Sequence, residues 1–316
     1  MVIGIIALLA AILLPALGNA KSRAQAVLCL NNERQLIIAW TTYASDNQDW
    51  AAPNGDGGST VIEESSYPNA GTYGMWLGGD MSGRFWNTDP TNFGLLNNSF
   101  QVPWTPPVGG FRYPVSAIGN YIGSYKICRC PADKSGYGSG GVDALGQTPS
   151  LDWGPRVRSY CMSSAVGTLY DARAAVAGIW LNAPGGVGAG DNKPGNPYNT
   201  YGKLSAFDNP GPANTFVIAD TDPYSIETPT LFTDMALPDC MVDWPASYHG
   251  RAGSFAFADG HSIIKHWADP RTYSINTTEA VAIPVQAGNP DIEWLRLKSS
   301  AYGDGSPLPL SVPPSP

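Results

Sequence analysis

The sequence predicts an α+β protein in which one long N-terminal helix carries a β-rich head with long loop insertions. The first 17 residues, MVIGIIALLAAILLPAL, contain no charged residue. Apolar residues then continue at three- and four-residue steps, which is typical of an amphipathic helix. Most of the 36 Gly, 28 Pro and 15 Tyr follow residue 50, and this composition is typical of loop-rich β structure.

The apolar N-terminal end predicts a membrane or filament-core segment over residues 1–20. A bilayer core needs roughly 20 helical residues, so the segment spans if it extends to Ala20, where Lys21 and Arg23 mark the boundary with water. Pro15 predicts a kink. A signal peptide cleaved after Ala20 is the alternative. We favour it less, because no basic residue precedes the apolar run.

The helical pattern extends well beyond the apolar run. It ends near Asp46, where Gly, Asn and Pro53 follow. One helix of about 45 residues is therefore predicted, which is long for a globular domain and typical of a stalk. The residues expected on its buried side are Ala24, Val27, Leu28, Leu36, Trp40, Tyr43 and Ala44.

We expect three parts: a stalk helix over residues 1–50, a head over residues 51–300, and a Pro/Ser-rich tail over residues 301–316. The net charge is −8. Acidic and basic residues balance in the first fifty positions, so the excess of acid lies on the head. An acidic head disfavours nucleic acid as a partner, since phosphates are bound by clustered Lys and Arg.

A β-hairpin is predicted around Asp259-Gly260. Residues 254–258 and 261–267 form its arms, and Asp-Gly suits a two-residue type I′ turn. In that register Phe255 lies opposite Ile264, and Phe257 opposite Ser262.

Several motifs occur in an order that resembles the bacterial type IV pilin-like superfamily, which includes pilins and type II secretion pseudopilins. The closest subgroup is that of prepilin-type proteins with a C-terminal H-x9-DG signature, here His249, Asp259 and Gly260. The resemblance covers most of the chain, through Ile3–Leu17, Cys29–Leu36, Tyr43–Asn47, Cys130–Asp133, Arg158–Tyr160, Pro212–Asp220 and the signature.

The resemblance implies a non-enzymatic subunit of a pilus-like filament or secretion pseudopilus. Its helix would pack on an antiparallel sheet and be anchored in the inner membrane before assembly into a periplasmic pseudopilus or extracellular filament. Partners would be copies of itself, other pilin-like subunits, the assembly machinery and the bilayer. The residues implied to enter the filament core are Ile3, Ile5, Ile6, Leu8, Leu9, Leu13, Leu14, Pro15 and Leu17.

Family members carry a basic leader and a Phe-Thr-Leu-Ile-Glu-like stretch before the apolar run. Either the natural start lies upstream of Met1, or this member is not processed and assembled in the usual way; we favour the upstream start.

A membrane-anchored surface carbohydrate-binding protein is the alternative function. Trp76, Trp86, Trp104 and Trp153 lie among Gly and Asn, and exposed aromatic side chains stack on sugars. Trp side chains that fill a small core beneath loops are the competing interpretation.

The five cysteines predict disulfides if the head lies outside the cytoplasm. Cys29 on the helix would bond Cys128 or Cys130, and we prefer Cys130. Cys161 with Cys240 is a second candidate pair. The odd count leaves one thiol over. Zinc is not predicted, because the spacings lack the paired Cys and His of zinc motifs.

His249 has three interpretations: a catalytic base, a metal ligand, or a hydrogen-bonded fastener for the loop before the hairpin. We favour the fastener. A triad with Ser254 and an Asp lacks a nucleophile-elbow motif, so no catalytic residue is predicted.

Asp220, Asp222 and Asp259 are candidate calcium ligands, because oxygen-rich loops bind this ion and some pseudopilins carry it. The alternative is that these residues cap turns.

Overall fold

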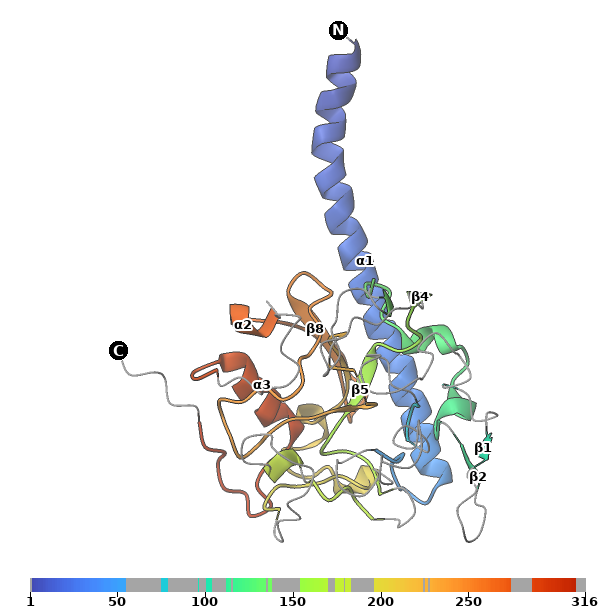
Figure 1. The fold of residues 1–316 in the computed structure, drawn as a ribbon, viewed down its shortest axis with the longest axis vertical. Helices are drawn as coiled ribbons and strands as arrows, with labels where there is room; N and C mark the ends of the chain where they lie inside the picture. Colours follow the sequence, from blue (N-terminus) through green and yellow to red (C-terminus); the bar gives the residue numbers. More distant parts are fainter. Residues whose placement is uncertain are drawn as a thin grey trace.

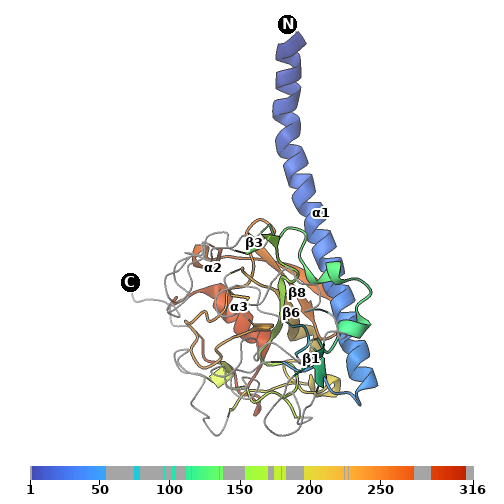
Figure 2. The ribbon, with the colours of Figure 1, turned by 45° about the vertical axis from the view of Figure 1, so that its right-hand side comes forward.

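The computed structural model describes residues 2–54, 75–78, 96, 101–103, 112–114, 116–134, 136–137, 154–169, 174–178, 180–182, 196–223, 225–226, 228–273 and 286–310. Its dominant feature is helix α1 (Val2–Asp46), whose N-terminal half projects from a rounded head (Figure 1). The C-terminal half of α1 lies along the side of the head (Figures 1 and 2).

The long helix predicted from the sequence is confirmed at 45 residues, and it is unbroken through position 15. Its buried side is only partly as predicted: Leu36, Trp40 and Ala44 are buried, and Tyr43 is half-buried. Ala24, Val27 and Leu28 are exposed instead, because the head covers this stretch on the side of Gln25 and Ala26, which are half-buried. The buried positions of α1 are Cys29, Glu33, Leu36, Ile37, Ala39, Trp40 and Ala44.

A five-stranded sheet forms the centre of the head. Its order is β7 (Thr230–Leu231), β5 (Tyr160–Ser163), β6 (Phe216–Asp220), β8 (Ala252–Phe257) and β9 (Ser262–His266). The α+β class is thus confirmed, but the sheet is mixed rather than antiparallel. The edge strand β7 runs parallel to β5, because the chain after β6 crosses beyond β5 to reach that edge.

The core lies where α1 packs against β6, β8 and β9 of this sheet. Every residue of β6 and β8 is buried. Two short antiparallel pairs lie outside the main sheet: β1 (Gln101–Pro103) with β2 (Arg112–Pro114), and β3 (Gly136–Tyr137) with β4 (Gly154–Pro155).

The hairpin is present, but its register differs from the prediction by one residue. Phe255 pairs with Ile263 rather than Ile264. The turn contains three residues, since Phe257 N–H donates to His261 C=O, and Gly260 has a positive φ of 93° while Asp259 does not. A single left-handed residue suits a three-residue loop, whereas type I′ needs two.

Two short helices follow the hairpin, α2 (Pro270–Tyr273) and α3 (Pro290–Ser299). The sequence prediction missed α3, although Asn289 caps its first turn by accepting from Asp291 N–H and Pro290 occupies a first-turn position. The buried Asp291 carboxylate accepts from Ala268 N–H at 2.9 Å and from Lys265 Nζ at 3.0 Å. These contacts fix α3 to the end of β9.

The tail was predicted to begin at residue 301, but the structure places the first part of this segment on the head. Arg296, buried on α3, donates to the carbonyl of Pro309 at 2.8 Å, and Tyr302 stacks on Tyr198. Residues 301–310 therefore belong to the head.

The buried and exposed faces of α1 give a stability prediction. Leu36→Ala leaves a cavity between α1 and the sheet, so it should lower the free energy of unfolding by about 2–5 kcal/mol. Ile38→Ala, at a side chain that is 63% exposed, should change it by less than about 0.5 kcal/mol. Urea unfolding of the full chain in detergent, followed by Trp fluorescence, measures both. Equal effects would contradict the packing of α1 described above.

Candidate functional site

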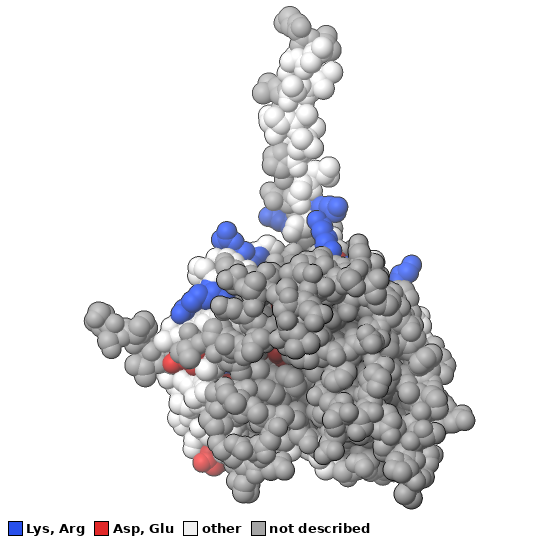
Figure 3. All heavy atoms as spheres, viewed as in Figure 1, with Lys and Arg blue, Asp and Glu red and all other residues white. Residues whose placement is uncertain are grey.

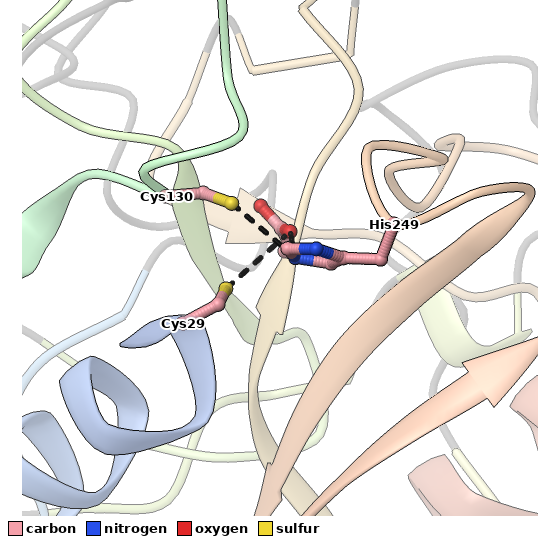
Figure 4. Close-up of side chains that lie close together, drawn as sticks. Cys29, Cys130 and His249 are labelled. Atoms are coloured by element: carbon pink, nitrogen blue, oxygen red, sulfur yellow. Dashed lines mark hydrogen bonds and ion pairs between the residues drawn. The ribbon is translucent and has the colours of Figure 1, made fainter. Parts of the chain in front are cut away.

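Four side chains of metal-ligating type meet where α1 enters the head. One ligand atom each from Cys29, Cys130, Asp220 and His249 lies within 4.8 Å of all the others, and all four residues are buried. Figure 4 shows both cysteine side chains directed toward the His249 ring.

Each residue comes from a different part of the chain. Cys29 is the first buried residue of α1 among those whose side chains are described. Cys130 follows the short 3-10 helix η4 (Tyr125–Cys128). Asp220 is the last residue of β6, and His249 lies in the turn before β8.

Polar side chains of α1 hold the Cys130 loop in place. Gln25 donates to the carbonyl of Pro131 at 2.8 Å, and Asn32 donates to that of Arg129 at 3.1 Å. These two residues flank Cys29 on the same side of the helix, since they are four residues before and three after it. The helix therefore holds the backbone on both sides of Cys130 opposite Cys29.

The His249 turn is held against the end of β6. Ala246 N–H donates to the carbonyl of Asp220 at 2.8 Å. The hydroxyl of Tyr248 donates to the carbonyl of Thr221 at 3.1 Å. Both contacts direct the imidazole of His249 toward the Asp220 carboxyl.

The contacts within the cluster are short. Cys130 Sγ lies 3.4 Å from His249 Nε2. His249 Nε2 lies 3.5 Å from Asp220 Oδ2, and Cys29 Sγ lies 3.8 Å from the same oxygen.

Two hydroxyl groups surround the Cys29 sulfur. Tyr160 Oη lies 3.0 Å from Cys29 Sγ, and Ser254 Oγ lies 3.1 Å from it. The Ser254 hydroxyl therefore belongs to the surroundings of Cys29.

Burial dominates the ionisation of the cluster. It raises the pKa of the Cys29 thiol well above its ordinary value and raises that of Asp220 to about 6. Burial opposes the charged form of His249, but hydrogen bonding to Asp220 raises its pKa to about 10. Burial therefore holds the Cys29 thiol in its protonated form.

The contacts of His249 argue against a Cys–His–Asp relay. In such a relay the nucleophile faces Nε2 and the carboxylate faces Nδ1. Here Cys130 and Asp220 both contact Nε2, while Nδ1 makes no hydrogen bond within the described part of the chain. The groups converge on one point instead of forming a chain of proton transfers.

The predicted disulfides are not formed. All five cysteines lie among the described residues, and all are buried free thiols. Cys29 and Cys130 do meet as expected, but the His249 and Asp220 side chains share the space between them. Cys161 Sγ instead lies 3.3 Å from the carbonyl of Thr228, and Cys240 is a separate free thiol.

The predicted calcium set is wrong as a single site. Asp220 is the last residue of β6. Asp259 lies near the opposite end of this strand, because it follows Phe257 of β8, which pairs with Phe216 at the start of β6. A five-residue strand separates them by about 16 Å, so one ion cannot bind Asp220, Asp222 and Asp259 together. The signature residues divide in the same way: His249 belongs to the cluster, and Asp259 and Gly260 form the distant turn.

Trp76 is buried, and its Nε1–H donates to the carbonyl of Pro229 at 2.8 Å. It therefore fills the core and does not form a sugar-stacking surface. Trp86, Trp104 and Trp153 lie outside the described residues.

The apolar half of α1 is a second candidate functional surface. Among the described residues, α1 is the one helix long and apolar enough to cross a membrane, and its most apolar window is not buried. These properties fit a membrane anchor or a signal sequence. Of the residues predicted to enter the filament core, the structure does not describe the side chains of Leu8 and Pro15. The others are all exposed: Ile3, Ile5, Ile6, Leu9, Leu13, Leu14 and Leu17.

No protein-family model matches the chain, and neither a curated protein nor a solved structure matches it.

The sequence prediction missed Glu33, an ionisable residue that is buried beside the cluster. It follows Cys29 by one helical turn and is fully buried. Its carboxyl oxygens make no hydrogen bond of ordinary geometry with a described residue. Burial raises the pKa of Glu33 well above its ordinary value, and the nearby Ser254 hydroxyl only partly offsets this. The sequence did contain a signal for this burial: Glu33 follows Cys29 by four residues, and residues with this spacing lie on the same side of a helix.

Glu33 gives a pH prediction. Above the ordinary Glu pKa the unfolded chain loses a proton that folded Glu33 retains, so the native chain loses stability as pH rises, by up to about 1.4 kcal/mol per pH unit. Glu33→Gln removes this dependence. The variant should therefore gain stability relative to the native chain between pH 5 and pH 8, measured by urea unfolding of reduced protein with EDTA.

Glu293→Gln, at a partly exposed position on α3, is the matched control and should show no such gain. A pH-independent difference for Glu33→Gln would mean that Glu33 is ionised in the folded protein.

Proposed function

We propose that this chain is a structural subunit of a type IV pilus-like filament or type II secretion pseudopilus, anchored in the inner membrane before assembly. The observation that carries the proposal is the division of α1 into an exposed apolar half and a half packed on the sheet. The order of pilin-like motifs along the sequence supports the same assignment.

The exposed half of α1 requires a covering. The helix is apolar on all sides from Ile3 to Leu17, and such a helix is stable in lipid or among other helices rather than in water. A membrane covers it before assembly, and the equivalent helices of neighbouring subunits cover it afterwards. A filament subunit therefore accounts for both the length and the composition of the stalk.

The distribution of charged side chains also fits a stalk that is anchored in a membrane. Lys and Arg side chains gather at the end of the head from which α1 emerges, while the Asp and Glu visible on this face lie farther from the stalk (Figure 3). Lys21 and Arg23 lie at this neck and are exposed. Basic groups at this level favour contact with anionic lipid head groups. The buried state of Trp76 gives no support to the carbohydrate-binding alternative.

Electron microscopy of filaments sheared from native cells, with mass spectrometry of their subunits, tests the proposal. The expected result is that this chain repeats along the filament with residues 3–17 in its core. Recovery of the chain solely as a membrane-bound monomer would overturn the assembly proposal.

A charged substitution on the stalk should prevent anchoring and assembly. Leu13→Arg places a charge in the centre of the apolar segment, which costs about 2.5–3.5 kcal/mol in a membrane. We expect a several-fold loss of the chain from the membrane and filament fractions. Leu310→Arg is the matched control, since Leu310 on the head is 62% exposed and Leu13 is 64% exposed. If both variants fractionate like the native chain, the apolar half of α1 does not mediate anchoring.

A further inference from the structure

We propose that Cys29, Cys130, Asp220 and His249 bind one zinc ion, which fastens the stalk helix to the head. The inference does not depend on filament assembly, because the four ligands lie within one chain.

Three of the six distances between the ligand atoms match a tetrahedral zinc site, and all six are within 4.8 Å. Zinc with bonds of about 2.0–2.3 Å to N, O and S keeps its ligand atoms about 3.3–3.8 Å apart. The three contacts from Cys130 to His249, from His249 to Asp220, and from Asp220 to Cys29 measure 3.4, 3.5 and 3.8 Å. All three fall within that range, so a metal ion can enter with small side-chain movements.

The chemistry of the ligands selects the metal. Two thiols, one imidazole and one carboxyl suit zinc, which accepts S, N and O ligands in four-coordinate sites. Calcium and magnesium prefer oxygen ligands alone, so the set fits neither of them. The Nε2 atom of His249 faces the common point between Cys130 and Asp220, as a ligand nitrogen must.

The side chains around the four ligands resemble those that surround the ligands of known types of metal site. The hydroxyls of Tyr160 and Ser254 lie at hydrogen-bond distance from the Cys29 sulfur, and such outer contacts orient and stabilise metal-bound thiolates.

The charges of the cluster balance best with a divalent cation. Two thiolates and one carboxylate carry three negative charges, and zinc reduces the total to −1. Binding releases the two thiol protons and the Nε2 proton of His249 to solvent, because all ligand atoms of a zinc site must be deprotonated.

The position of the cluster defines what the ion does. Cys29 lies where α1 enters the head, and the other three ligands come from the Cys130 loop, the end of β6 and the turn before β8. One ion therefore ties four chain segments together at the root of the stalk (Figure 4). We name this site the zinc clamp.

The test uses the full reduced chain in detergent, stripped with EDTA and titrated with Zn²⁺ or Co²⁺. We expect one metal per chain, and with cobalt a visible absorption of tetrahedral type together with a near-ultraviolet thiolate-to-cobalt band. Cys130→Ser should weaken zinc binding by more than about 100-fold, since loss of even an outer contact costs about 10- to 100-fold. His249→Gln should weaken it similarly.

Cys128→Ser is the matched control, because Cys128 is equally buried and lies two residues from Cys130 but outside the cluster. It should retain one metal per chain. If a ligand variant fails to fold, the cobalt spectrum of the native chain still decides the question.

Three results would overturn the zinc clamp. They are a reduced native chain without a thiolate–cobalt band, full metal binding in both Cys130→Ser and Cys29→Ser, and a Cys29–Cys130 disulfide without metal in protein isolated from cells.

Discussion

The contact between the C-terminal half of α1 and the face formed by β6 and β8 is the interaction on which the rest of the structure depends. Hydrogen bonds from Gln25 and Asn32 to the Cys130 loop add to this contact, but the first buried side chain of α1 among those described is Cys29. Leu36, Ile37 and Trp40 bury apolar area against strands that are themselves buried along their whole length. This burial supplies most of the stability of the contact, since the gain scales with the apolar area removed from water.

The same contact contains a polar section that the apolar packing does not explain. Cys29 and Glu33 occupy successive turns on the buried side of α1, and they face groups that also titrate. Apolar residues at these positions would avoid the desolvation that raises the pKa values of Cys29, Glu33 and Asp220. Buried polar groups of this kind are stable when each finds a partner. A zinc ion would provide that partner for the ligand residues and give the polar section a structural purpose.

The sequence was sufficient to predict the features that arise from local patterns. The 45-residue helix follows from an unbroken periodicity, and the hairpin follows from Asp-Gly between two apolar arms. The register of the hairpin could not be predicted, because the choice between two- and three-residue loops depends on how Phe255 and Phe257 pack in the core. The start of the buried face was also misplaced, because a search for apolar spacing passes over Cys29 and Glu33, which are buried for tertiary reasons.

The sequence predicted that Cys29 lies beside Cys130, but not that His249 and Asp220 join them. Zinc motifs are recognised in sequences by closely spaced ligands, but each of these four ligands comes from a separate segment. Only the crossing of α1 over the end of β6 brings Cys29 to Asp220, and only the Gln25 and Asn32 contacts place Cys130 opposite them. The spacing argument against zinc was therefore incomplete, because it considered neighbours along the chain and not neighbours in the fold.

The position of the cluster connects the two proposals. A helix held by lipid or by other helices at one end and by the head at the other must carry any force between them across its root. Apolar packing resists separation without fixing direction, because the hydrophobic effect is non-directional, whereas metal–ligand bonds fix both distance and angle. A zinc ion at Cys29 would therefore act at the point where the free part of α1 becomes the packed part. There it would hold the head in a constant orientation on its stalk, as a regular filament of repeating subunits requires.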